Sequence, residues 1–442
     1  MSKPVVAIVG RPNVGKSTLF NAIAGQRLAI VQDTPGVTRD RIYADVTWLD
    51  RAFLLVDTGG IEPDSQDVIL SQMREQAQIA IDTADVIIFI TDVKSGLQDN
   101  DARVCEMLRK SHKPIVLAVN KVDDFQKYQA DVYEFYNLGI GDPMPVSAAG
   151  KQGLGDLLDV VTGHFRPLDE EGEEAEGARI AVIGKPNVGK SSIINKLSGE
   201  ERLIVSDIAG TTRDAVDMSI VHEGRPYIFV DTAGIRRQKK IKDEIERYSI
   251  IRTVAAVERC DIAVLVIDAT SGITSQDARI AGIAHEEGKG MIIAVNKWDA
   301  IEKTDKSVYE FRDMIRRALP FLNYADILYI SAETGLRLGK LYENIDAILD
   351  NQTMRIPTGV LNEIISEATM LNQPPSDKGK RLKIFYTTQV SVAPPTFIFF
   401  VNSKELMHFS YTRYLENKLR ESFGFRGTPL RFITRERKKD GR

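Results

Sequence analysis

Cysteine is nearly absent from this sequence of 442 residues, which contains only Cys105 and Cys260. A chain of this length needs no disulfide, so we expect two thiols in a reducing cytosol. No apolar run approaches the roughly 20 residues that a spanning helix needs; stretches such as Ile262–Ile267 are strand-length. A basic and apolar leader is also missing, because the strand-like segment Val5–Val9 comes almost at once. These absences favour a cytoplasmic protein without a membrane span.

Charge is unevenly distributed along the chain. The whole sequence carries a net charge of −4, with 43% hydrophobic and 27% charged residues, as in ordinary globular domains. Residues 378–442 contain 15 Lys or Arg against 5 Asp or Glu, a net charge of +10, which leaves −14 for residues 1–377. A basic end on an acidic body favours a nucleic-acid or ribosomal surface as partner; the alternative is a solvated basic face.

An internal repeat is the strongest signal in the sequence. Three short motifs occur twice in the same order: Gly10–Ser17 and Gly184–Ser191, Asp57–Gly60 and Asp231–Gly234, Asn120–Asp123 and Asn296–Asp299. The first pair is identical at seven of eight positions, and the offsets are 174, 174 and 176 residues. A period this long is typical of a duplicated domain rather than of a solenoid.

Apolar runs in each copy predict the fold class. Four runs per copy are bounded by polar or turn residues: Val5–Val9, Phe53–Val56, Val86–Thr91 and Ile115–Asn120, then Ile180–Ile183, Ile228–Val230, Ile262–Ile267 and Met291–Val295. Continuous runs suit strands of a central, mostly parallel sheet with helices on both faces. We therefore predict two tandem α/β domains, residues 1–167 and 179–350, separated by an acidic linker at residues 168–178.

The pattern changes after residue 350. Residues 351–442 are predicted to form a small α+β domain without a phosphate loop, followed by a basic tail. Its expected elements are a helix, a loop, two strands, a helix and a strand: Gly359–Leu371, Asn372–Gly379, Arg381–Val392, Thr396–Val401, Lys404–Glu421 and Leu430–Thr434.

A Gly-x-x-x-x-Gly-Lys-Ser motif follows a strand and opens a helix in both copies. Backbone amides of such a loop converge on the β-phosphate of a nucleotide, and the helix dipole adds to the attraction. Lys16 and Lys190 are expected to reach the β- and γ-phosphates in catalysis, and the next serine places its hydroxyl on Mg²⁺. The predicted residues are Gly10, Arg11, Pro12, Asn13, Val14, Gly15, Lys16 and Ser17, and Gly184, Lys185, Pro186, Asn187, Val188, Gly189, Lys190 and Ser191.

An Asp-x-x-Gly motif follows the second predicted strand of each copy. Its carboxylate is expected to hold the Mg²⁺ shell and its glycine amide to sense the γ-phosphate. The motif residues are Asp57, Thr58, Gly59, Gly60 and Ile61, and Asp231, Thr232, Ala233, Gly234 and Ile235. Upstream, Thr38 and Thr212 each lie in Gly-x-Thr-Arg-Asp, where a threonine binds Mg²⁺ and reports the γ-phosphate; the alternative is a capped turn. The catalytic candidates are Lys16, Thr38, Gly60, Lys190, Thr212 and Gly234.

An Asn-Lys-x-Asp motif selects the base. Its aspartate accepts hydrogen bonds from N1 and N2 of guanine, a donor pair that adenine lacks. A Ser-Ala dipeptide follows at a later strand end, where a backbone amide meets the guanine O6. The predicted residues are Asn120, Lys121, Val122, Asp123, Ser147 and Ala148, and Asn296, Lys297, Trp298, Asp299, Ser331 and Ala332.

With these motifs in order, the chain resembles the Der (EngA) family, double-domain GTPases of bacteria within the TrmE-Era-EngA-like group. The resemblance covers the whole length: GTPase domain, acidic linker, GTPase domain and KH-like domain. It implies GTP and GDP as ligands, Mg²⁺ as cofactor, GTP hydrolysis, and a switch role in biogenesis of the large ribosomal subunit, with rRNA as partner. A monomer is expected.

The resemblance also carries a departure from Ras-like enzymes. In those enzymes a glutamine after Asp-x-x-Gly orients the attacking water, whereas Ile61 and Ile235 stand there in this chain. Asn13 and Asn187 match the asparagine that helps hold K⁺ in potassium-stimulated relatives, where the cation replaces an arginine finger electrostatically. The alternative is that each asparagine only stabilises its loop.

The C-terminal domain and the overall role leave alternatives open. Gly424–Gly427 has the letters of the Gly-x-x-Gly clamp of KH domains but precedes the last strand, so we interpret it as a turn and expect RNA contacts from scattered Lys and Arg, from Lys378 to Arg435–Arg442. One rival function is a GTP-gated RNA-binding protein with one slow or regulatory site. Another is a non-ribosomal, RNA-related GTPase.

Overall fold

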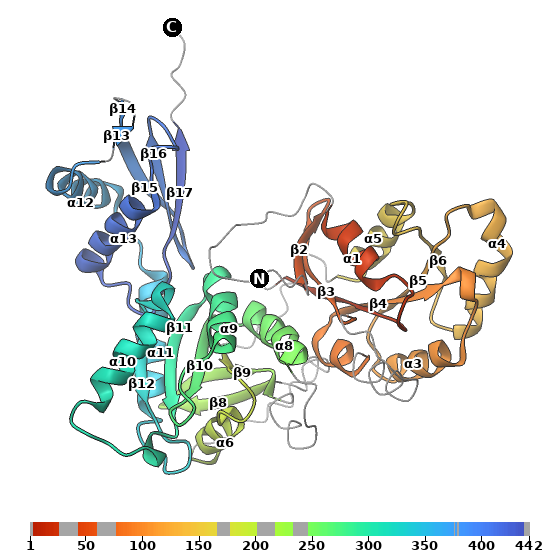
Figure 1. Ribbon diagram of the computed structural model, residues 1–442, viewed down its shortest axis with the longest axis horizontal. Coiled ribbons are helices and arrows are strands. Elements are labelled where there is room, and N and C mark those ends of the chain that lie inside the picture. The colour runs from red at the N-terminus through yellow and green to blue at the C-terminus, as the bar shows by residue number, and fades with distance from the viewer. Residues whose placement is uncertain are drawn as a thin grey trace, which may run out of the picture. The chain divides into compact units, whose positions relative to one another are not determined.

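The computed structural model describes residues 3–25, 43–59, 77–165, 177–200, 217–232, 246–374, 376–377 and 380–436. Contacts divide the chain into two units (Figure 1). Unit 1 comprises residues 1–175 and 241–259, and unit 2 comprises residues 176–240 and 260–442. The predicted Thr38, Gly60, Ile61, Thr212, Ala233, Gly234 and Ile235, and linker residues 168–176, lie outside the described residues.

Unit 1 contains a six-stranded sheet in the order β2-β3-β1-β4-β5-β6, parallel except for the β2–β3 pair. Its strands are β1 Val5–Val9, β2 Tyr43–Trp48, β3 Arg51–Asp57, β4 Val86–Asp92, β5 Ile115–Asn120 and β6 Met144–Pro145. Its helices include α1 Lys16–Ala24, α3 Asp99–Arg109, α4 Phe125–Glu134 and α5 Leu154–Gly163. Apolar residues of α1 and α5 share one core with alternate residues of the central strands, so these helices cover one face of the sheet (Figure 1).

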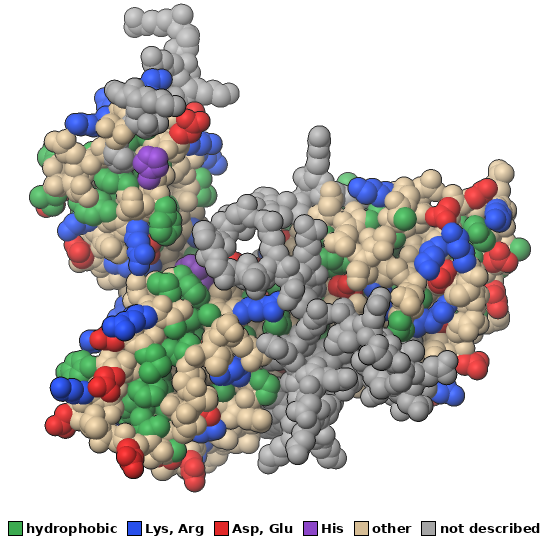
Figure 2. Space-filling view, viewed as in Figure 1, with side chains coloured by type: hydrophobic (Ala, Val, Ile, Leu, Met, Phe, Trp, Pro, Cys, Tyr) green, Lys and Arg blue, Asp and Glu red, His purple; other side chains and the backbone are tan. Residues whose placement is uncertain are grey.

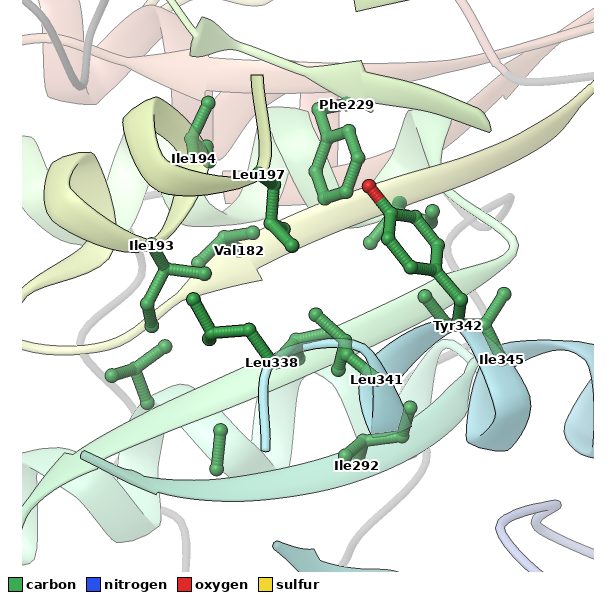
Figure 3. Close-up of a cluster of buried hydrophobic side chains, with 14 of the residues drawn as sticks. Val182, Ile193, Ile194, Leu197, Phe229, Ile292, Leu338, Leu341, Tyr342 and Ile345 are labelled. Atoms are coloured by element: carbon green, nitrogen blue, oxygen red, sulfur yellow. The ribbon is translucent and has the colours of Figure 1, made fainter. Parts of the chain in front are cut away.

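Unit 2 repeats this topology as β8-β9-β7-β10-β11-β12. The strands are β7 Ala178–Ile183, β8 Met218–His222, β9 Arg225–Val230, β10 Ile262–Asp268, β11 Gly290–Asn296 and β12 Asp326–Tyr329, with helices α6 Lys190–Glu200, α9 Ser275–Glu286, α10 Ser307–Ala318 and α11 Lys340–Thr353. Figure 3 shows the core between the sheet, α6 and α11, where Val182, Leu197 and Leu341 converge. The predicted class of two α/β domains with mostly parallel sheets is confirmed.

All eight predicted apolar runs are strands, but the edge strands were missed. Strands β2 and β8 pair antiparallel with β3 and β9. Their sequences, YADVTW and MSIVH, mix polar and apolar residues because an edge strand is only partly buried. Strands β6 and β12 are only 2 and 4 residues long, too short for a periodic signal.

The C-terminal module packs two helices against one face of a three-stranded sheet. Its elements are α12 Thr358–Leu371, β13 Ser376–Asp377, β14 Lys380–Arg381, β15 Ile384–Val392, β16 Pro395–Val401, α13 Phe409–Phe423 and β17 Arg431–Glu436. Strand β16 is central, antiparallel to β15 and parallel to β17. The predicted α+β architecture is confirmed, with two corrections to its elements.

The predicted helix Lys404–Glu421 begins five residues late. The backbone of His408 is extended, with φ −66° and ψ 150°, and the amide of Lys404 donates to a Glu436 carboxylate oxygen, so these residues form a turn against β17. The predicted loop at 372–379 contains β13, which forms a short hairpin with β14. Neither feature has an apolar periodicity.

The unit boundaries differ from the predicted domain boundaries in two respects. Helix α8, Glu246–Arg259, falls in the predicted second domain but groups with unit 1, where Arg252 pairs with Asp82 at 2.9 Å. The C-terminal module groups with the second GTPase sheet, because Gly427 exchanges backbone hydrogen bonds with Tyr324 and Met291. The domain boundaries themselves stay predictions.

Two findings on the described residues concern the cysteines and the helices. Cys105 and Cys260 are both buried and free, as expected for thiols. Among the helices of the described ranges, none has the length and apolar character needed to cross a membrane.

Candidate nucleotide-binding sites

The phosphate loop of unit 1 joins β1 to α1 at the carboxyl end of the sheet. Lys16 is the first residue of α1 and is only 6% exposed. Its Nζ donates to the carbonyl oxygens of Gly10 and Arg11, both at 2.8 Å. Burial lowers the pKa of Lys16 to about 8, against the opposing attraction of Asp57. The loop therefore curls around a primary amine whose charge is poorly solvated and available to an anion.

Unit 2 repeats this arrangement between β7 and α6. Lys190 Nζ donates to the carbonyl oxygens of Gly184 at 2.7 Å and Lys185 at 2.6 Å. Burial lowers its pKa to about 8 as well, opposed by Asp231 and Asp277. Because the two lysines donate to carbonyl groups at equivalent positions of their loops, the local conformation follows from the shared motif.

Left-handed backbone explains two residue types in each loop. Asn13 and Asn187 both have φ 64°, a conformation that asparagine tolerates better than most residues. Gly15 has φ 98°, and a Cβ there would lie 2.4 Å from Asn120 Nδ2. Gly189 repeats this with φ 101°. The asparagines thus have a loop-forming role in addition to any contact with a cation.

The Asp-x-x-Gly carboxylate of unit 1 lies beside the phosphate-loop serine. Ser17 Oγ donates to Asp57 Oδ2 at 2.8 Å, and the amide of Gly59 donates to Asp57 Oδ1 at 2.9 Å. A hydroxyl and a carboxylate are the hard oxygen ligands that Mg²⁺ prefers, so this pair fits the cation. In unit 2, Asp231 has φ 56°, unlike Asp57, and its amide donates to Asp217.

Asn120 connects the base-recognition loop to the phosphate loop. Its side chain is 2% exposed; Nδ2 donates to the carbonyl of Val14 at 2.8 Å, and Oδ1 accepts from the amide of Ala148 at 2.9 Å. Asn296 makes the same two bonds with Val188 and Ala332 in unit 2. Three motifs far apart in sequence are thereby brought together in each unit.

The two aspartates predicted to select guanine, Asp123 and Asp299, are exposed, and each accepts a hydrogen bond from a serine. Ser147 Oγ donates to Asp123 Oδ1 at 2.7 Å, and Lys94 Nζ donates to Asp123 Oδ2 at 2.7 Å. Hydrogen bonds from Lys94 and then Ser147 lower the pKa of Asp123. In unit 2 a hydrogen bond from Ser331 lowers the pKa of Asp299.

Four predicted ligand contacts have buried side chains instead. Val14 and Val188 belong to the hydrophobic cores, Val122 is 4% exposed, and Trp298 packs edge-on against Phe311. Side chains in these positions stabilise the loops, so only their backbone groups remain for a nucleotide. The motif letters alone do not distinguish these two uses of a residue.

Sequence reasoning missed two kinds of supporting carboxylate. Asp92 and Asp268 end β4 and β10 and accept from Lys121 at 2.7 Å and Lys297 at 2.6 Å. Their position at the end of an apolar run was a usable signal.

The second kind lies within helices. Asp101 and Asp277 are fully buried in α3 and α9 and hold Arg11 and Lys185, each at 3.0 Å. Burial raises the pKa of Asp101, opposed by Arg11. Both residues also close a capping box at the start of their helix, with Gln98 and Thr274, but their cationic partners lie about 90 positions away and could not be predicted from this local signal.

Comparisons with known proteins agree with this geometry. Residues 5–121 and 179–297 match a family described as 50S ribosome-binding GTPase, and residues 355–435 match one described as the C-terminal KH-domain-like region of EngA bacterial GTPase enzymes. The chain is 69% identical over 440 residues to GTPase Der of Agathobacter rectalis and 59% identical over 442 residues to GTPase Der of Alkaliphilus metalliredigens, with 100% of each chain covered.

Solved structures with similarity to the chain include Era in complex with MgGDPNP and nucleotides 1506–1542 of 16S ribosomal RNA. That similarity covers 38% of this chain and 59% of the other, with 28% identity and a TM-score of 0.30. The FeoB G-domain from Methanococcus jannaschii is 24% identical over 37% of this chain and 98% of its own, with a TM-score of 0.28.

Proposed function

Because the chain belongs to the Der family of GTPases, we propose that both nucleotide sites bind and hydrolyse GTP and that their state switches binding to a precursor of the large ribosomal subunit. The chain is a GTPase with two GTPase domains. The proposal adds that residues 1–167 and 179–350 each form a complete site, that residues 351–442 form the docking domain, and that the protein works in the cytoplasm as a monomer.

One observation carries the assignment of two working sites. In each unit a buried lysine at the start of a helix, an asparagine at the end of a strand and the aspartate three residues after it occupy equivalent places. A degenerate copy is expected to lose at least one of these features, and the described residues keep all of them. This supports turnover at both sites over a purely regulatory second site.

The chemistry follows from where the charges lie. Lys16 and Lys190 exchange their carbonyl partners for β- and γ-phosphate oxygens, and they stabilise charge as water attacks the γ-phosphate in line. Asp123 and Asp299 orient the nucleotide through guanine. Thr38 and Thr212, with the amides of Gly60 and Gly234, form the segments that respond to the γ-phosphate.

Cations complete the proposed site. Ser17, Thr38 and Asp57, and Ser191, Thr212 and Asp231, would hold Mg²⁺, which neutralises phosphate charge when bound. Isoleucine at positions 61 and 235 cannot orient water by hydrogen bonding. We therefore assign to Asn13 and Asn187 a K⁺ that offsets the developing charge.

Potassium dependence separates the ligand role of the asparagine from its loop role. We expect faster hydrolysis in KCl than in NaCl at equal ionic strength. Asn13→Gly keeps the φ 64° backbone accessible while removing the amide oxygen, so it should abolish the K⁺ stimulation at the first site and leave GDP affinity nearly unchanged. Stimulation that persists in Asn13→Gly would assign the asparagine to loop formation alone.

Sedimentation tests the ribosomal partner. The intact chain, loaded with a GTP analogue or with GDP, is run with 50S and 30S subunits on sucrose gradients across a salt series. Co-migration with 50S in only one nucleotide state is the expected result, since a switch needs different contacts in its two states. Equal binding in both states would remove the switch, and no binding to either subunit would favour a non-ribosomal RNA.

A further inference from the structure

The sheet of the C-terminal module has one covered face and one open face. Phe397, Phe399 and Val401 of β16 are fully buried in the core that α12 and α13 complete. Neighbouring residues along a strand point to the opposite face. On that face Thr396 and Ile398 of the central strand are 8% and 6% exposed, whereas Tyr386 of β15 and Ile433 of β17 keep 43% and 42% of their surface exposed. The module thus presents large side chains on the side away from its helices.

An aromatic pair and a guanidinium form one row across the open face. Tyr386 lies opposite Phe400, and Phe400 lies opposite Arg435. The rings of Tyr386 and Phe400 stack with centroids 4.3 Å apart and planes 10° apart. A stacked pair held by strand register is rigid, so a further flat group can add to the stack with little loss of side-chain entropy.

Basic residues gather at the same end of the sheet. Strand β15 begins where β16 and β17 end, since Ile384 pairs with Val401 and Val401 with Glu436. Lys380 and Arg381 are exposed in the hairpin leading into β15, and Lys383 Nζ lies 5.5 Å from the ring centroid of Phe385. Residues 380–436 contain 10 Lys or Arg and 4 Asp or Glu, and Figure 2 shows Lys and Arg side chains interspersed with hydrophobic ones over this module.

The Gly-x-x-Gly turn is not available for an RNA clamp. Phe425 is fully buried, and Gly427 uses both its N–H and its carbonyl in bonds to Tyr324 and Met291. Gly427 also has φ 68°, and a Cβ there would lie 2.3 Å from Ile348. The turn attaches the module to the second GTPase sheet, as Asn351 and Asp326 do through their bonds to Arg426. A nucleic acid must therefore meet another surface.

We propose that the open sheet face binds single-stranded RNA, with an unpaired base stacked on Tyr386 and Phe400 and its phosphates held by Lys380, Arg381 and Arg435. This inference rests on the proposed ribosomal function, because it names the surface that would contact the RNA. Unstacked bases present their faces to aromatic rings, whereas a duplex hides them. An acidic peptide would use the cations but leave the stack without a role.

Binding of a labelled oligonucleotide to the intact chain tests whether the face with Tyr386 and Phe400 binds RNA. The probe is a fluorescein-labelled 12-nucleotide oligouridylate, followed by anisotropy at several salt concentrations. Tyr386→Ala should weaken binding about tenfold, as loss of a base-stacking residue does, and should leave the salt slope unchanged because no phosphate contact is removed. Arg435→Gln should reduce the slope. Tyr386→Trp should retain wild-type affinity.

A matched control lies on the helical side of the same module. Phe409 at the start of α13 is 79% exposed, so Phe409→Ala removes as much exposed ring without touching the sheet and should bind like wild type. The RNA-binding proposal is overturned if Tyr386→Ala binds like wild type, if Phe409→Ala loses as much affinity, or if a duplex of the same length binds as tightly. Sedimentation of the wild-type chain with 50S subunits tests the proposed function independently. The ribosomal proposal fails if the wild-type chain does not bind, whatever the Tyr386 variants do.

Discussion

The two phosphate loops share their motif but are braced by different ion pairs. In unit 1, Arg11 Nε lies 3.0 Å from both carboxylate oxygens of Asp101. In unit 2, Lys185 Nζ contacts Asp277 Oδ2 at 3.0 Å, and Asp277 Oδ1 is buried without a hydrogen-bond partner. The Nε–H of Arg11 is shared between both oxygens of its buried carboxylate, whereas the ammonium of Lys185 contacts one oxygen of Asp277. The two copies thus share the residues predicted to bind the nucleotide but differ in the ion pair that supports the loop.

The base-recognition loops diverge in the same way. Lys94 of unit 1 pairs with Asp123, whereas the equivalent Thr270 of unit 2 donates to Asp268 at 2.7 Å. Asp123 therefore has a competing cation beside the atoms that meet guanine. The pair is exposed, so its effect on nucleotide affinity is expected to be small and sensitive to salt.

The segment after β3 and β9 also differs. A Cβ on Gly59 would lie 1.7 Å from Lys16 Cε, so the end of the Lys16 side chain lies directly against the backbone of Gly59. The corresponding Ala233 lies outside the described residues, and Asp231 two positions before it takes φ 56°. Asp231 thus leaves β9 with a left-handed backbone conformation that Asp57 does not have at the end of β3.

The largest effect is expected where the two copies agree, at the guanine-selecting aspartates. Asp123→Asn or Asp299→Asn in the intact chain should lower GTP affinity at that site by roughly three orders of magnitude, because an amide donor then meets guanine donors. Xanthosine triphosphate should bind the altered site instead, so each site can be assayed separately by single-turnover hydrolysis. An unchanged preference for GTP over ATP in both variants would refute the assignment.

The number of protons taken up when nucleotide binds should also be equal at the two sites. The pKa of Lys16 and of Lys190 is about 8, and phosphates favour the charged amine, so binding at pH 8 should take up about half a proton per site and about a tenth at pH 7. Because the folded pKa is lowered, stability without nucleotide should rise between pH 8 and 10.5, where the unfolded chain binds more protons. Calorimetry in two buffers of different ionisation enthalpy measures the uptake; none at pH 8 would contradict the burial of the lysines.

Exchanging Arg11 and Lys185, the cations that pair with the buried aspartates, should shift the unfolding free energies of the two units in opposite directions. Arg11→Lys should lower the unfolding free energy of unit 1 by about 1 kcal/mol, and Lys185→Arg should raise that of unit 2 by a similar amount, because one buried oxygen loses or gains a partner. Trp48 and Trp298 are the two tryptophans of the chain, one in each unit. Replacing one by Phe lets fluorescence report urea unfolding of the other unit. Shifts of the same sign would show that the number of carboxylate oxygens contacted by the cation is not the cause.

The smallest effect on nucleotide affinity is expected at Lys94, the cation that pairs with Asp123. Lys94→Thr should tighten GDP binding at the first site about threefold, and Thr270→Lys should weaken it at the second by a similar factor, as for exposed ion pairs. Both differences should shrink in 0.5 M salt. Weaker binding in Lys94→Thr would instead mean that the lysine holds Asp123 in place for guanine.

Local sequence was sufficient for the features that depend on residues close together in the chain. The repeated motifs predicted both phosphate loops, and the apolar runs predicted the central strands, because buried parallel strands are continuously apolar. Gly424–Gly427 was interpreted as a turn, and its glycines have φ 87° and φ 68°. The site residues as nucleotide ligands stay predictions.

Tertiary structure alone decided the features that depend on distant partners. The ion pairs of Asp101, Asp277 and Lys94 could not be predicted from the sequence, because each partner lies 29 to 92 positions away, as Asp123 does from Lys94. Trp298 shows the opposite case: it was predicted from its motif to contact the nucleotide, but its side chain is buried in the protein. The Tyr386–Phe400 stack likewise exists only through strand register, which pairs side chains that no local pattern can match.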